Sequence, residues 1–204
     1  MEQTTTGQFR VLAGRDDGEW LLLDTESGDP TYVARRDAPD LRAGNRIDAA
    51  LGWTDGDPTL TDCEVTDETR VRFTRTDEPI FEAATRCWDD AVSAGSGMNA
   101  RVTHGTDGDP NGIVYTFADQ PGRQDVFAEL RDGVKPLEPL LVRAAGGREH
   151  YHEERQGATP PFAVFVLDPD EPYVVVYIVL DPDGFLAETV RDTYFESGSL
   201  SDRL

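Results

Sequence analysis

Residues 173–180 constrain the fold more than any other stretch of this chain. They read Tyr-Val-Val-Val-Tyr-Ile-Val-Leu, a run of β-branched and aromatic residues that favours a strand. The run is apolar on both faces, and such a strand needs cover on both sides. A second apolar run at 162–167 and turn residues at 168–172 precede it, which together predict a hairpin. We therefore expect this hairpin at the centre of a sheet, with other elements packed against it.

Two stretches, one directly after this hairpin and one earlier in the chain, have helical periodicity. Leu186, Val190 and Tyr194 recur every four residues behind Asp183, which we expect to cap that helix. An earlier helix is expected to start at the cap residue Asp77. Its predicted inner face is formed by Ile80, Phe81, Ala84, Cys87, Trp88 and Ala91. A shorter helix is predicted at 120–132, and residues 140–142 fit either a strand or a helical turn.

The pattern of the first 74 residues predicts strands and no helices. Five strand-like segments separated by Gly, Asp and Pro turns occur within about 70 residues, a spacing typical of a small barrel. The piece around Leu41, Gly44 and Ile47 resembles the strand entry of OB-type barrels, with another five-stranded β unit as the alternative.

The predicted fold class is α+β, in two domains. Residues 1–74 form a five-stranded OB-like β-barrel, and residues 75–204 form an antiparallel sheet packed with helices. Hairpins outnumber crossovers in the second part, which argues against a doubly wound fold. The polar end of the chain predicts a frayed tail from about residue 196.

The charge balance is strongly acidic. The chain has 40 Asp and Glu against 19 Lys and Arg, a net charge of -21, and Lys135 is its single lysine. Because 38% of the residues are hydrophobic and strongly patterned, the charge belongs to the surface of a folded protein rather than to a disordered chain. This composition resembles that of haloarchaeal proteins, which work in molar salt, where the Debye length falls to about 3 Å.

Three stretches resemble a family of small acidic haloarchaeal proteins of unknown function. They are Met98 to Val102, Thr106 to Gly112 and Val190 to Tyr194. The similarity runs through nearly the whole chain, and it implies habitat and solubility without any activity or functional residues.

The cysteine content and hydropathy predict a cytoplasmic protein. Cys63 and Cys87 are the only cysteines, and we expect both to be reduced core thiols. No secretory h-region and no apolar stretch of about 18 residues is present, so no membrane partner is expected. The sequence leaves the oligomeric state open.

The first functional hypothesis is a non-catalytic binding or accessory module that contacts nucleic acid or a protein partner. Aromatic rings on the predicted barrel could stack on bases, and nearby arginines could contact phosphates. The candidate residues are Trp20, Tyr32, Arg35, Arg42, Arg46 and Trp53. Core packing of the rings and ion pairing of the arginines are the structural alternatives.

The second hypothesis is a metal-assisted hydrolase. Asp107, Asp109 and Asn111 match the first half of a calcium loop, and His104 lies close by in sequence. The second half fails, because Ala118 stands where the bidentate Glu belongs. The similar motif at 54–58 indicates that such sequences are turns in this chain.

A second group of potential metal ligands lies further along the chain. His150 and His152 with two neighbouring glutamates offer a further set of transition-metal ligands in a predicted loop. Apart from a divalent cation at Asp107, Asp109 and Asn111, the sequence predicts no cofactor and favours a protein that is not an enzyme.

The net charge of -21 leads to a salt prediction. The melting temperature should fall as KCl is withdrawn from molar to millimolar concentration, because carboxylates of the compact state repel once the screening length reaches about 30 Å near 0.01 M. Thermal melts across a KCl series measure this, with a melt series in sucrose as the control for non-ionic stabilisation. A melting temperature that stays flat across the series would remove the haloarchaeal interpretation.

Overall fold

The computed structural model describes all residues except 1–2, 120–121, 123, 147–157 and 197–204. The chain forms two compact units: residues 1–70 with 128–160, and residues 71–127 with 161–204. The sequence predicted a second domain that begins at residue 75; the described residues 128–146 and 158–160 group with the first unit. The described residues contain two five-stranded sheets and four α-helices, so the α+β class is confirmed.

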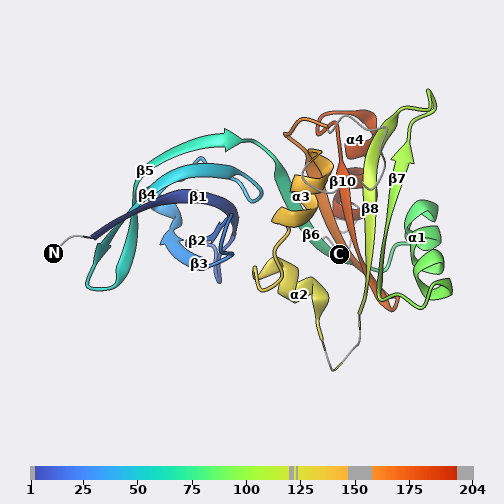
Figure 1. The fold of residues 1–204 in the computed structure, drawn as a ribbon, viewed down its shortest axis with the longest axis horizontal. Coiled ribbons are helices and arrows are strands. Elements are labelled where there is room, and N and C mark those ends of the chain that lie inside the picture. Colours follow the sequence, from blue (N-terminus) through green and yellow to red (C-terminus); the bar gives the residue numbers. More distant parts are fainter. Residues whose placement is uncertain (1–2, 120–121, 123, 147–157, 197–204) are drawn as a thin grey trace, which may run out of the picture. The chain divides into compact units, whose positions relative to one another are not determined.

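The sheet of the first unit is antiparallel and has the strand order β3-β2-β1-β4-β5 (Figure 1). Its strands are β1 (Gln3–Ala13), β2 (Glu19–Asp24), β3 (Pro30–Ala34), β4 (Arg46–Thr54) and β5 (Asp57–Asp67). A single turn of 3-10 helix, Arg35–Asp37, follows β3.

Strand β1 is the centre of this sheet. Its first part, from Gln3 to Arg10, pairs with β4, and its last part, from Phe9 to Ala13, pairs with β2. Strands β4 and β5 carry two register irregularities, which bend a sheet. The sheet curls until Cα atoms of β3 and β5 approach within 8 Å. Among the described residues these two strands share no ladder, so the predicted barrel is not closed.

Both faces of the central strands are covered. The concave face holds one apolar core, made of Phe9, Val11, Trp20, Leu22, Val33, Leu41, Ile47, Ala49, Leu51 and Leu60. On the other face, Leu12, Leu21 and Leu23 are also buried. Gly133 lies against this face, since a Cβ added there would stand 2.8 Å from Leu23 and 3.1 Å from Leu21. The segment after Ala128 therefore covers the convex face.

A buried arginine fixes that covering segment. Arg10 on β1 is 3% exposed, and its Nε and Nη2 donate to Glu138 at 2.7 and 3.0 Å. Glu138 begins helix α3 (Glu138–Ala144). The Nη1 of Arg10 donates to the Gly44 carbonyl at 2.7 Å and to Asp67 at 3.1 Å. The other oxygen of Asp67 accepts from the Thr69 N–H, so the buried charges are hydrogen-bonded.

The second unit contains the other sheet, in the order β6-β9-β10-β8-β7. The pairs β9·β10, β10·β8 and β8·β7 are antiparallel, as predicted. Its strands are β6 (Arg70–Thr76), β7 (Met98–His104), β8 (Pro110–Ala118), β9 (Ala163–Pro169) and β10 (Tyr173–Val179). The apolar run at 173–180 is thus the central strand, with every residue of β10 buried.

Helices α1 (Glu82–Ser93) and α4 (Phe185–Arg191) cover one face of this sheet. The alternate side chains of β10 form a core with them, together with Ala84, Cys87, Ala187 and Val190. The intervening side chains Val174, Val176 and Ile178 point to the opposite face and are fully buried there as well. This burial on both faces accounts for the uninterrupted apolar sequence of the strand.

The helices start later than their predicted caps. Phe81 precedes α1 and Gly184 precedes α4, and neither helix has a side-chain cap. The side chain of Asp181 accepts from the N–H of Asp183 in the preceding turn, so the expected cap residue stays outside α4. The described part of the helix predicted at 120–132 is α2 (Val126–Arg131). Residues 140–142 are helical and belong to α3.

Candidate ligand-binding pocket

The predicted stacking residue Trp20 is a core side chain. It is 5% exposed, and its Nε1 donates to the Ala38 carbonyl at 3.0 Å. The guanidinium of Arg35 lies over its ring, 3.9 Å from the centroid. The ring therefore has no open face for a base, and Arg35 presents its guanidinium in place of the ring.

The other predicted binding residues lie apart. Trp53 packs against the concave core and donates from Nε1 to Thr5 at 3.0 Å. Arg46 contacts Thr66 on β5, and Arg42 is exposed in the segment before β4. None of these three lines the same pocket as Arg35.

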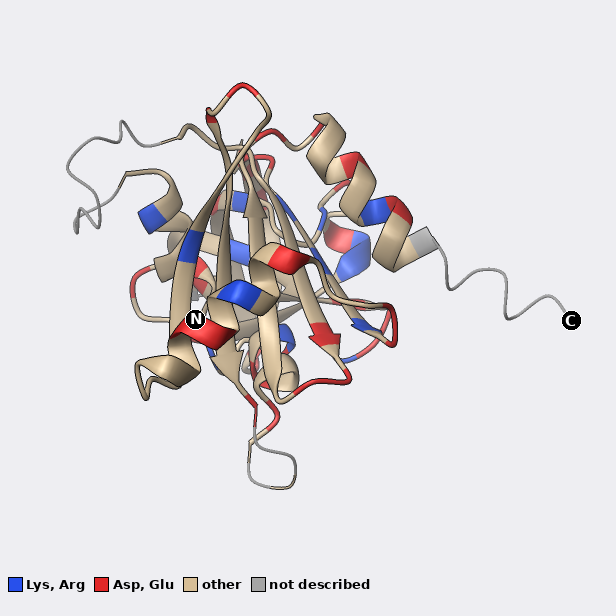
Figure 2. Ribbon diagram, turned by 90° about the vertical axis from the view of Figure 1, so that its right-hand side faces the viewer, with Lys and Arg blue, Asp and Glu red and all other residues tan. Residues whose placement is uncertain are grey.

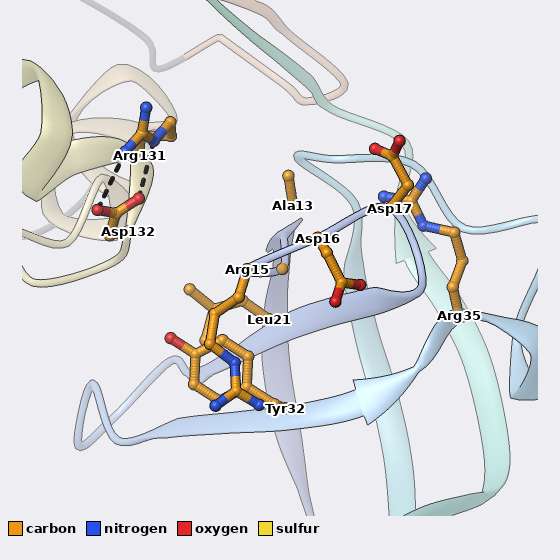
Figure 3. A pocket seen from close by; sticks show the side chains of 10 residues that line it. Ala13, Arg15, Asp16, Asp17, Leu21, Tyr32, Arg35, Arg131 and Asp132 are labelled. Atoms are coloured by element: carbon orange, nitrogen blue, oxygen red, sulfur yellow. Dashed lines mark hydrogen bonds and ion pairs between the residues drawn. The ribbon is translucent and has the colours of Figure 1, made fainter.

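Tyr32 and Arg35 do meet, in a pocket of about 560 Å³ within the first unit (Figure 3). Small-molecule sites have volumes of about 300–1,000 Å³. The pocket is formed by the β1–β2 loop (residues 14–18), the end of β3 and the end of α2. Its charged and aromatic lining consists of Arg15, Asp16, Asp17, Tyr32, Arg35, Arg131 and Asp132.

Two of the three arginines in the pocket are neutralised. Arg15 donates through Nε and Nη2 to Glu19 at 2.9 and 2.8 Å and lies 4.2 Å from the centre of the Tyr32 ring. The hydrogen bond between them raises the pKa of Arg15 and lowers the pKa of Glu19. Arg131 forms a two-point pair with the neighbouring Asp132.

Arg35 has a different environment. Its Nε is buried and has no hydrogen-bond partner in the part of the chain that the structure describes. Within the same described residues no acid lies within ion-pair distance of its guanidinium. An unpaired buried N–H costs about 1–3 kcal/mol, so such a group calls for an explanation.

Sequence reasoning missed five charged members of the pocket: Arg15, Asp16, Asp17, Arg131 and Asp132. Arg15 follows strand β1 in a turn, and its sequence context predicted a loop residue without indicating a binding role. Arg131 lies about 100 residues further along the chain and reaches the pocket because the segment after Ala128 folds back onto the first unit. No local pattern could have placed it there.

The loop that resembled half a calcium site is the β7–β8 turn. Asp107 accepts from the N–H of Asp109 at 3.1 Å, which is ordinary turn chemistry. Asn111 accepts at 2.7 Å from the hydroxyl of Thr103, which lies 2.9 Å from the hydroxyl of Tyr177. Burial raises the pKa of Tyr177.

Metal-ligating side chains do not gather in the described ranges. There, no three His, Cys, Asp or Glu side chains lie close enough together to hold a metal ion. His104 is exposed at the end of β7. His150 and His152 lie outside the described residues.

The acidic residues are on the surface. Figure 2 shows Asp and Glu mainly in loops and on helices. Asp67 is the one fully buried acid of the described chain.

Both cysteines are free, Cys87 buried and Cys63 partly so, and burial raises the pKa of both thiols. In the described part, no helix is long and apolar enough to cross a membrane.

A curled five-stranded sheet with an arginine-lined pocket, together with a helix-covered antiparallel sheet, defines a two-unit α+β protein with a candidate binding site. The chain belongs to DUF6663, a family of unknown function, whose match covers residues 1–199.

Two further comparisons add little to this assignment. No curated protein matches the chain. A crystal structure of a protein of unknown function, DUF1344 from Bacteroides vulgatus, is similar at 12% identity and a TM-score of 0.23, covering 90% of this chain and 93% of that one.

The tight packing of Gly112 next to the β7–β8 turn allows a mutational test, and calcium-dependent stability distinguishes a turn from a cation site at Asp107 to Asn111. A Cβ on Gly112 would stand 2.6 Å from the Tyr177 ring and 2.8 Å from the Thr103 hydroxyl. Gly112→Ala should therefore lower the free energy of unfolding by about 1–3 kcal/mol, as overpacking does. Gly97→Ala, whose Cβ would meet nothing closer than 3.9 Å, is the control. Denaturant melts measure both, and a calcium-dependent rise in wild-type stability would contradict the turn interpretation.

Proposed function

We propose that this protein is a non-catalytic binding module whose first unit binds single-stranded nucleic acid at the pocket around Arg35. The observation that carries the proposal is Arg35 itself, stacked on Trp20, without an acidic partner among the described residues and lining a pocket of about 560 Å³. A guanidinium in this state is a ready partner for a phosphate.

The strand arrangement supports the proposal. We infer that the first unit is an open OB-like barrel, in which β1 pairs with both β2 and β4 while β3 and β5 approach each other. OB-folds are partly open five-stranded barrels that bind oligonucleotides on the face of strands 2 and 3 and at the loop between strands 1 and 2. The pocket is lined by the β1–β2 loop, by Leu21 on β2 and by Tyr32 on β3.

The charge of the molecule limits how the ligand is held. With a net charge of -21, the protein repels a long polyanion, so contacts to many phosphates are disfavoured. The lining of the pocket carries three arginines and three aspartates, which makes it a nearly neutral place on an acidic surface. One phosphate at the guanidinium of Arg35 and a few bases held by a flat group such as Tyr32 fit this limit.

The salt response of such an interface would suit the habitat that the composition suggests. We propose a cytoplasmic protein of a salt-rich haloarchaeal cell, where phosphate contacts weaken steeply with salt and stacking contacts do not.

The alternative of a metal-assisted hydrolase has no supporting observation, because turn hydrogen bonds account for the Asp107 to Asn111 loop.

The test is fluorescence anisotropy with labelled single-stranded RNA and DNA pools in 2 M KCl. We expect binding, and we expect Arg35→Ala to weaken it about tenfold, since a charge-assisted hydrogen bond contributes about 1.5–3 kcal/mol. Arg42→Ala is the matched control, because Arg42 is exposed, lies in the same unit and does not line the pocket. Circular dichroism melts verify that both variants fold.

Two results would contradict the proposal. Wild-type protein that binds neither RNA nor single-stranded DNA would reject the nucleic-acid ligand and leave a protein partner. Equal losses in the Arg35 and Arg42 variants would move the binding surface away from the pocket.

A further inference from the structure

Resting on this proposed function, we propose that the pocket binds one guanine nucleotide, with its phosphate at Arg35 and the donor edge of its base at Asp17. Two charged groups of the pocket, Asp17 and Arg35, have no internal hydrogen-bond or ion-pair partner in the described chain and are available to a ligand.

Most of the charged lining is already engaged. Arg15 is held by Glu19 and Arg131 by Asp132, each through two hydrogen bonds. Asp16 accepts from the Gly18 N–H at 2.8 Å through one of its oxygens. Within the described chain, the carboxylate of Asp17 and the guanidinium of Arg35 are the charged groups of the pocket that have neither a hydrogen bond nor an ion pair.

These two groups belong to one end of the pocket. The backbone N–H of Arg35 donates to the Gly18 carbonyl at 2.7 Å. This bond connects the β1–β2 loop to the residue that carries the guanidinium. Figure 3 shows Asp17 and Arg35 at the end away from Arg131 and Asp132. The two side chains do not pair with each other, although both charges lie in one pocket of the described chain.

A ligand that satisfies both groups must carry an anion and hydrogen-bond donors. A carboxylate only accepts hydrogen bonds, and it accepts two best when the donors are parallel and adjacent. Among the nucleobases, guanine offers such a pair on its pairing edge, the ring N1–H and the exocyclic N2 amine. Adenine, cytosine and uracil mix donors with acceptors on that edge, and an acceptor would face the carboxylate unfavourably. Guanine with a phosphate is therefore the nucleotide that matches Asp17 and Arg35 together.

The pocket also has the flat surfaces and the volume that a nucleotide needs. Arg35 is stacked on Trp20, which leaves the outer side of its guanidinium for a phosphate, and the Arg15–Tyr32 pair provides a flat surface for the base. A volume of about 560 Å³ lies in the range of small-ligand pockets.

The experiment is isothermal titration calorimetry of the whole chain with GMP, IMP, AMP and guanosine. IMP lacks the N2 amine and differs from GMP in that group alone. We expect GMP to bind about tenfold more tightly than IMP or AMP, which is the discrimination that one two-point contact to a base supplies. Asp17→Asn should abolish the preference for GMP over IMP. Arg35→Ala should weaken GMP about tenfold and leave guanosine unchanged.

Asp48→Asn is the control, since Asp48 is exposed on β4 and does not line the pocket. Equal affinity for GMP and IMP, or a preference that survives Asp17→Asn, would overturn this inference. Strand binding that depends on Arg35 without any GMP binding would overturn it too, while leaving the proposed function intact. Absence of strand binding with GMP binding retained would instead reject the proposed function alone.

Discussion

The buried guanidinium of Arg10 is the interaction on which the first unit depends. It stands between Glu138 and Asp67, with the Gly44 carbonyl as a third acceptor, and its side chain is 4% exposed. Desolvating an arginine and two carboxylates is costly, and hydrogen bonds must compensate for that cost. Once the network exists, removing one partner leaves the others buried without compensation, which costs about 3–5 kcal/mol. Arg10 therefore stabilises one arrangement of the strands and α3 strongly.

That arrangement determines the composition of the pocket. Because Glu138 is held on β1, the segment from Ala128 to Ala144 lies on the convex face of the sheet, with Gly133 against the leucines of β2. The same segment brings Arg131 and Asp132 into the pocket formed by the β1–β2 loop. A structural ion pair thus positions two residues of the candidate binding site, although it contacts no ligand itself.

The sequence predicted those features that local periodicity records. The run at 173–180 could be assigned to a central strand because burial on both faces leaves no polar position in it. The contact between Arg10 and Glu138 spans 128 residues and has no local signature, so the sequence did not predict that the described residues after Ala128 pack on the first sheet. Trp20 and Arg35 were both selected, but their stacking on each other depends on how far the sheet curls, which strand patterns do not specify.

Hydrogen–deuterium exchange of Arg10→Met tests this account most directly. Methionine fills similar space without the charge, so Glu138 and Asp67 would remain buried and unpaired. The account predicts that amides of residues 128–146 exchange faster in the variant. Arg101→Met, which removes an exposed pair with Asp90, should leave the exchange of that segment unchanged. Unaltered protection of residues 128–146 in Arg10→Met would contradict the claim that this buried network holds the segment in place.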